Sequence, residues 1–139
     1  MTVKPLRGNL PGQMSNQHCA LMFDEARLEL TIKLFGFWDL AIAETLNRDI
    51  GKYISELGAA GVPRESLLVL IDVRESSIVA NTLTDILKAS IQRNGYLSKK
   101  VSILCGSILQ KTQYKRLTPY DNFGHFTSES EAYAWLHDG

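Results

Sequence analysis

The sequence predicts an α/β domain with a mixed β-sheet and helices packed on it, in the order ββαβαβαβα. Three observations predict this class. Residues 67–71 form an unbroken apolar run that ends on Asp72, as expected of a strand buried on both faces. Residues 28–34 alternate between apolar and polar side chains, which is typical of a strand with one wet face. Apolar stripes at helical spacing then alternate with short apolar runs.

The sequence of the N-terminal region predicts a flexible arm followed by a β-hairpin. Residues 1–18 contain two prolines and two glycines among scattered polar groups, and we expect a flexible arm there. Regular structure is expected from Cys19 onward, in a single domain that spans residues 19–139. Residues 19–23 form a short first strand. This strand and residues 28–34 predict an antiparallel hairpin at one edge of the sheet.

A long helix is expected directly after the hairpin. Asp39 is a suitable N-cap, because its side chain can accept a hydrogen bond from the first turn. Apolar residues then recur at spacings of three and four, which predicts one buried stripe. The stripe consists of Leu40, Ala43, Leu46, Ile50, Tyr53, Ile54 and Leu57. Gly58 and Gly61 are expected to end the helix, and Pro63 prevents it from resuming.

The middle of the chain predicts two more helices with a strand between them. A helix is expected over residues 78–94, and the apolar run at residues 100–105 predicts the strand that follows it. Ser107 is expected to cap the next helix. The buried side of that helix is expected to carry Leu109, Tyr114 and Leu117.

The C-terminal segment predicts a last strand and a last helix. Residues 122–126 form a short strand candidate, and Pro119 ends the helix before it. Ser128 and Glu131 have the spacing of a capping box, which predicts a helix beginning at this point. That helix is expected to pack Ala132, Trp135 and Leu136 inward.

Composition limits the function classes. Lys and Arg total 15 and Asp and Glu total 15, and this neutrality argues against a general nucleic-acid binder. No apolar run approaches the roughly 20 residues of a membrane span, and no secretory signal is recognisable at the start. Cys19 and Cys105 are expected to be buried thiols in a reducing compartment. Together these observations predict a cytoplasmic protein without a membrane span.

Four local features resemble the STAS domain, and in particular the small bacterial SpoIIAA-like proteins. They are Gly36-Phe37-Trp38-Asp39 before a long helix, the strand end Ile71-Asp72-Val73-Arg74, the strand at residues 101–104 before a helix, and the ending from Phe126 to Leu136 with its Ala132 and Trp135. The resemblance covers about residues 19–136. It implies a SpoIIAA-like fold and a non-catalytic regulatory role with a protein partner.

This chain has no serine at the position that signalling members of the STAS family phosphorylate. In signalling members of the STAS family, a partner kinase phosphorylates a serine at the start of the second helix, within a motif like D-x-S-x-x-x-x-x-D-S-S-G. Placing Asp72 on the first aspartate of the family motif puts Asn81 at the phosphorylated position and Thr82 after it. Most of the motif is therefore absent from this chain. Thr82, Ser76 and Ser77 are the alternative acceptors.

The candidate site follows the buried strand. We expect residues 73–77 to form a loop at its carboxyl end, where open α/β sheets place their sites. The next helix would offer free N–H groups and a partial positive charge to an anionic group. We therefore predict a protein-binding surface made of Arg74, Glu75, Ser76, Ser77, Asn81, Thr82, Gly106 and Ser107. The simpler alternative is helix capping by Ser76 or Ser77, with solvated charges beside it.

A second hypothesis rests on an aromatic cluster. Phe35, Phe37 and Trp38 meet where the second strand passes into the first helix, and at least one must lie outside an alternating core. Core packing is the favoured reading. The functional alternative is a dimer patch, or a pocket near the first two helices in a carrier or sensor for a lipid-like or other apolar ligand. An exposed edge strand keeps a homodimer open as well.

No enzyme, metal site or cofactor is expected. Cys105 precedes a helix start, but Lys111 stands where a phosphatase loop would carry an arginine. A buried cysteine at the strand end is therefore the favoured interpretation. His18, His125 and His137 are far apart in the sequence, and no pair has ligand spacing with a carboxylate or thiol.

Overall fold

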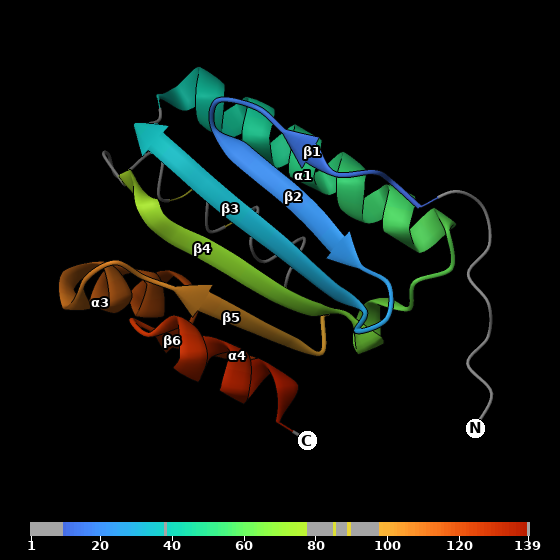
Figure 1. The fold of residues 1–139 in the computed structure, drawn as a ribbon. Helices are drawn as coiled ribbons and strands as arrows, with labels where there is room; N and C mark the ends of the chain where they lie inside the picture. Colours follow the sequence, from blue (N-terminus) through green and yellow to red (C-terminus); the bar gives the residue numbers. More distant parts are fainter. Residues whose placement is uncertain (1–9, 38, 78–84, 86–88, 90–97, 139) are drawn as a thin grey trace.

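The computed structural model describes residues 10–37, 39–77, 85, 89 and 98–138, and of Phe37 it describes the backbone alone. It shows a six-stranded mixed sheet with helices on both faces (Figure 1). The strands are β1 (Met14–Ser15), β2 (Cys19–Asp24), β3 (Glu29–Phe37), β4 (Leu68–Ser77), β5 (Lys100–Leu104) and β6 (Phe123–Phe126). The helices are α1 (Leu40–Ala59), the short 3₁₀ helix η1 (Arg64–Ser66), α3 (Ile108–Leu117) and α4 (Glu129–His137).

The predicted fold class is confirmed. The strands lie in the order β1-β2-β3-β4-β5-β6, with antiparallel pairing from β1 to β3 and parallel pairing from β3 to β6. The predicted helix over residues 78–94 lies outside the described residues, apart from Asp85 and Ala89, which are helical. Regular structure begins earlier than expected, because β1 pairs with β2 through Met14 and Leu21.

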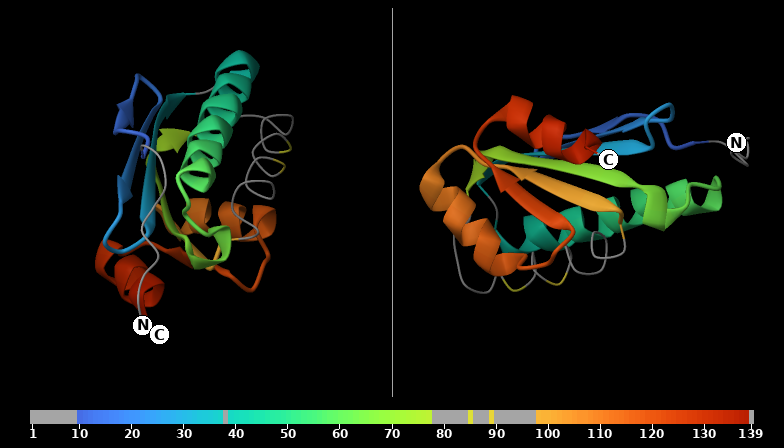
Figure 2. Two further views of the ribbon diagram at one scale, coloured as in Figure 1. Left: turned by 90° about the vertical axis from the view of Figure 1, so that its right-hand side faces the viewer. Right: turned by 90° about the horizontal axis from the view of Figure 1, so that it is seen from below.

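Two apolar layers hold the sheet. The larger layer lies between one face of the sheet and helices α1 and α3, and it includes fully buried Leu21, Leu30 and Ile103. The smaller layer lies on the opposite face, where α4 packs Ala132 and Leu136 against the sheet (Figure 2). Burying one large apolar side chain contributes roughly 1.5–3 kcal/mol, so these layers supply most of the stabilisation.

The helix caps are confirmed, but two predicted core positions are wrong. Asp39 accepts from the Ile42 N–H at 2.8 Å, as expected of an N-cap. Leu40 is nevertheless 47% exposed, because the buried stripe of α1 begins one turn later. Leu109 is 70% exposed, and Tyr114 is the one buried residue of α3.

Strand β4 is longer than predicted, and the expected loop at residues 73–77 is wrong. The pairing of Lys33 with Asp72 and of Phe35 with Glu75 spans two steps in β3 and three in β4, so β4 contains a one-residue bulge. Beyond it, β3 continues to Phe37 and keeps β4 paired as far as Ser77.

The bulge shifts which side chains of β4 point into the core. Val69 and Ile71 before the bulge, and Val73 within it, face the larger core layer. After the bulge Ser76 is buried and Glu75 is exposed, and Arg74 within the bulge is exposed as well. Gly36 in β3 lies opposite Ser76 with φ of 79°, a conformation that glycine adopts readily and other residues do not. The sequence pattern of β4 therefore changes phase without ending the strand.

Helix α4 is held at both ends by polar contacts. Ser128 caps its start by accepting from the Glu131 N–H at 3.4 Å. At its end, the Lys100 ammonium donates to the carbonyl oxygens of Trp135 and Asp138 at 2.8 and 2.7 Å, and it lies 4.8 Å from the centre of the Trp135 ring. A cation at a helix C-terminus satisfies carbonyl groups that have no partner within the helix. No helix of the described residues is long and apolar enough to cross a membrane.

Replacing Lys100 with methionine should loosen α4 from the sheet. We expect Lys100→Met to lower the free energy of unfolding by about 1–2 kcal/mol, because two carbonyl groups lose a charged donor. Urea unfolding followed by circular dichroism measures this change. Lys99→Met is the matched control, since Lys99 is exposed, and it should change stability little. Equal effects of the two substitutions would contradict the capping role of Lys100.

Candidate functional site

The ends of strands β4 and β5 are joined by one side chain, Gln110. Its amide oxygen accepts from the Gly106 N–H at 2.7 Å, and its amide nitrogen donates to the Val73 and Ser76 carbonyls at 2.8 and 3.2 Å. Gly106 packs closely, because a Cβ atom there would lie 3.3 Å from the Arg74 carbonyl oxygen. The structure therefore brings together two predicted site segments that are about thirty residues apart in the chain.

The serines of the candidate site have different roles. Ser107 caps α3, and its hydroxyl accepts from the Gln110 N–H at 3.1 Å. Ser76 is buried, and its hydroxyl donates to the Val73 carbonyl at 3.1 Å, so its side chain faces the core and not a partner. Ser77 is exposed at the end of β4. The other two predicted positions, Asn81 and Thr82, lie outside the described residues.

The charged side chains of the site take part in ion pairs within the fold. Arg74 binds the buried Asp72 carboxylate through two contacts, Nε–Oδ1 at 3.0 Å and Nη2–Oδ2 at 2.8 Å, and its Nη1 lies 3.5 Å from Glu129 at the start of α4. Glu75 pairs with Lys33 at 3.0 Å. The Lys33–Glu75 pair is exposed and contributes at most about 1 kcal/mol, so a partner can compete for it.

Asp72 stays ionised although it is buried. Burial alone would raise the pKa of its carboxyl group. Hydrogen bonds from the Arg74 side chain and N–H, together with the positive charges of Arg74 and Lys33, outweigh burial and hold the pKa of Asp72 below its usual value. The Asp72 carboxylate therefore fixes the Arg74 guanidinium near the carboxyl end of β4.

Sequence reasoning missed two exposed apolar residues beside this edge. Ile108 is 76% exposed and Leu109 is 70% exposed, in the first turn of α3 directly after Ser107. The helical spacing of about 100° per residue places Leu109 about 140° around the axis from buried Tyr114. The separation of about 140° between Leu109 and Tyr114 follows from the sequence alone. It indicates that the two side chains cannot both face the core.

Most of the large exposed apolar residues stand at helix starts at this end of the sheet. Four large ones are exposed among the described residues, and three of them begin a helix that follows the carboxyl end of a parallel strand (Figure 1). These three are Leu40, Ile108 and Leu109. Met22 on β2 is the fourth. Ile108 and Leu109 are adjacent in the chain, and they are the exposed apolar pair on which an interaction surface could be centred.

Cys105 is placed as a structural residue. It is fully buried, which confirms the favoured interpretation of this position, and burial raises its pKa to about 11 although Lys111 acts in the opposite direction. At neutral pH the group is a protonated thiol, whereas a nucleophile must be a thiolate. Burial likewise raises the pKa of Cys19.

The histidines serve separate contacts. His137 Nε2 lies 3.1 Å from the carboxylate of buried Glu29. His125 Nε2 lies 2.6 Å from the Thr118 hydroxyl, which donates to the Tyr114 carbonyl and thus accepts from His125. In the part of the chain that the structure describes, no three His, Cys, Asp or Glu side chains are grouped to hold a metal ion.

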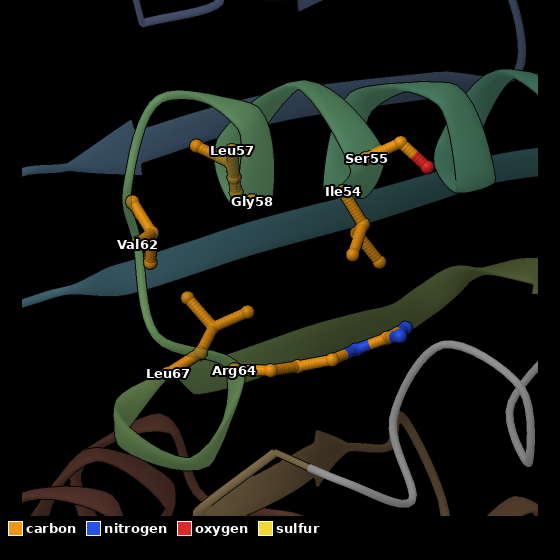
Figure 3. Close-up of a pocket in the computed structure, with 7 residues that line it drawn as sticks. All are labelled: Ile54, Ser55, Leu57, Gly58, Val62, Arg64 and Leu67. Carbon is orange, nitrogen blue, oxygen red and sulfur yellow. The ribbon is translucent and has the colours of Figure 1, made fainter. Parts of the chain in front are cut away.

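The aromatic cluster is described in part. Phe35 is half-buried on β3, with the Lys33 ammonium 5.5 Å from its ring centre. The Phe37 side chain and Trp38 lie outside the described residues. A cavity of about 140 Å³ lies near the C-terminal end of α1 (Figure 3), smaller than the roughly 300–1,000 Å³ of typical ligand sites. It is lined by Ile54, Ser55, Leu57, Gly58, Val62, Arg64 and Leu67.

Several solved structures are similar to this chain. An uncharacterized DUF3478-family protein from Shewanella loihica with a SpoIIAA-like fold superposes with a TM-score of 0.61 and 21% identity, over 90% of this chain and 99% of the other. An anti-sigma factor antagonist from Mycobacterium paratuberculosis gives 0.59 and 16%, over 90% and 100%. Unphosphorylated SpoIIAA, also an anti-sigma factor antagonist, gives 0.55 and 16%, over 85% and 95%.

These likenesses show the fold, which is the SpoIIAA-like, STAS-type fold that the sequence motifs predicted. No protein-family model matches the chain, and no curated protein matches it. At identities of 16–21% the structural likeness does not extend to individual site residues.

Removing the Gln110 amide should separate the two segments of the site. We expect Gln110→Ala to lower the free energy of unfolding by about 1–3 kcal/mol, since the Val73 carbonyl and the Gly106 N–H each lose a hydrogen bond. Amide hydrogen exchange should speed up at Gly106. Gln113→Ala on the exposed side of α3 is the control and should change neither quantity. Unchanged exchange at Gly106 in Gln110→Ala would show that Gln110 does not join the segments.

His125 should make stability depend on pH. Burial, together with Lys115 and Lys111, lowers the pKa of His125 to about 4. An unfolded histidine titrates near 6.5. Between these values the unfolded chain binds more protons, so stability falls as the pH falls from about 6.5 to about 4. His125→Gln should lose less stability over this range, by up to about 2 kcal/mol, in urea titrations. Parallel pH profiles would contradict this assignment.

Proposed function

We propose that this SpoIIAA-like chain is a non-catalytic regulatory domain that binds a protein partner at the carboxyl ends of β4 and β5. The binding surface comprises Arg74, Glu75 and Ser77 from β4, the turn at Gly106 and Ser107, and the apolar residues Ile108 and Leu109. We call it the β4–β5 edge, by which we mean the carboxyl-terminal rim of these two central strands and not an unpaired edge strand.

The exposed pair Ile108 and Leu109 carries the proposal. Covering one such side chain with a partner stabilises a complex by roughly 1.5–3 kcal/mol before the costs of association. Interfaces commonly combine a small apolar centre with a polar rim. Here the rim is Glu75 and Arg74, and Gln110 fixes both segments in one arrangement before a partner arrives. A preorganised surface loses less entropy on binding.

The similar structures support a regulatory role. Two of them are described as anti-sigma factor antagonists, which points to regulation through protein partners in those proteins. We extend that role to this chain at the level of the domain and not of the partner. When Asp72 is placed on the first aspartate of the family motif, Asn81 falls at the phosphorylated position, and we propose partner binding that does not require phosphorylation there.

Two features favour binding over catalysis or ligand transport. Cys105 is buried and protonated at neutral pH, so it is a poor nucleophile. The hollows along α1, of about 140, 210 and 290 Å³, are each smaller than the roughly 300–1,000 Å³ of typical ligand sites. The carrier or sensor, the cytoplasmic location, the homodimer and the domain boundary at Cys19 stay predictions.

Site-specific crosslinking in the native host tests the proposed surface. A photoreactive amino acid at Ile108 should form a discrete adduct with one protein, because this side chain would lie at the centre of the interface. The same amino acid at Gln113, on an exposed part of α3, is the matched control and should give no such adduct.

Charge variants complete the test. Ile108→Glu with Leu109→Glu should abolish the interaction when the crosslinked protein is purified and titrated, while the urea midpoint stays close to the wild-type value because both side chains are exposed. A specific adduct at Gln113 but not at Ile108, or unchanged affinity of the double variant, would refute the proposed surface.

A further inference from the structure

Two hollows of about 210 and 290 Å³ lie along one flank of α1, between this helix and the segment that contains β1. We call the two together the groove. One wall is a continuous stripe of α1, made of Ala41, Ile42, Thr45, Leu46, Asp49, Lys52, Tyr53 and Glu56. The other wall is the segment that contains β1, through Pro11, Gly12, Met14, Asn16 and His18. Figure 1 shows β1 beside α1.

The groove has the length of a short extended peptide. From Ile42 to Glu56 the helix advances about 21 Å at 1.5 Å per residue. Six residues of an extended strand span about 20 Å. A compact small molecule would fill only part of this length, whereas an extended segment matches it from end to end.

The groove also borders an unpaired strand edge. Among the described residues, β1 is the edge strand of the sheet and pairs with β2 alone. The Asn16 N–H donates to the Cys19 carbonyl at 2.9 Å. Because successive residues of an antiparallel strand point their backbone groups in opposite directions, Ser15 presents its N–H and C=O away from β2. An added strand can bind such groups, as in β-augmentation.

The charges of the groove favour a basic occupant. Its lining carries three carboxylates, from Asp39, Asp49 and Glu56, and one ammonium, from Lys52. A second copy that offered its own β1 segment is a poor match, because residues 10–18 contain no Lys or Arg. Complementary charge across an interface raises the association rate and selects the partner.

We propose that this groove binds an extended, lysine- or arginine-rich segment of a partner protein, which adds to β1 as a further strand along α1. Backbone hydrogen bonds to Ser15 hold the segment, and Asp49 and Glu56 pair with its basic side chains. Half-buried Met14 and Ile42 provide apolar contacts for its alternate residues.

Short synthetic peptides test this proposal on the full chain. The probes are a hexapeptide that alternates lysine with valine, a counterpart with glutamate in place of lysine, and the lysine peptide with methylated backbone nitrogens. Fluorescence anisotropy should show the lysine peptide binding at least about tenfold more tightly than either of the other two. Amide hydrogen exchange at Ser15 should slow when the lysine peptide is bound.

Charge reversal on α1 locates the site. Glu56→Lys should weaken binding of the lysine peptide about tenfold at low salt. Glu44→Lys changes the net charge equally on an exposed α1 position outside the groove, and it should leave the affinity within about twofold. Absence of binding at millimolar peptide, equal effects of the two variants, or binding without protection at Ser15 would each overturn the proposal. The crosslinking experiment at Ile108 tests the β4–β5 edge separately, so its outcome does not depend on these peptide-binding results.

Discussion

The burial of β4 on both faces is the constraint on which the rest of this molecule depends. Val69 and Ile71 face the layer under α1, while Leu70 faces α4 on the other side. A strand of this kind needs paired neighbours on both edges and a helix on each face, because its apolar side chains and its backbone groups must all leave water. The parallel pairing with β3 and β5 and the split of helices between two faces follow from that requirement.

Polar chemistry at the end of β4 follows from the same burial. Asp72 is buried because it lies on β4, and a buried carboxylate is tolerated only with charged or hydrogen-bonding partners. Arg74 supplies both, and its guanidinium then reaches Glu129 on α4. Gln110 satisfies the carbonyls at the strand end in a similar way. The β4–β5 edge is thus ordered by groups that are satisfied internally, with its apolar residues left outward.

Local signals in the sequence predicted local structure well. The caps Asp39, Ser107 and Ser128 are confirmed, because a cap depends on residues three positions apart. Leu109 was assigned to the core because its side chain is apolar, although the packing of α3 against the sheet leaves its position outward. The role of Gln110 depends on β4 and β5 being neighbours, and spacing along the chain gives no sign of that tertiary contact.

The loop predicted at residues 73–77 is wrong for a related reason, because the pairing of β4 with β3 beyond the bulge is a tertiary contact that the sequence of β4 alone does not reveal. The consequence of the bulge reaches sequence comparison. A relative whose β4 is regular would need a single-residue gap beside Val73, and without that gap its core residue would be matched to outward-facing Glu75. Among proteins that share this fold at low identity, a residue-by-residue transfer of interaction positions beyond Asp72 is therefore sound only once the bulge has been located in each structure.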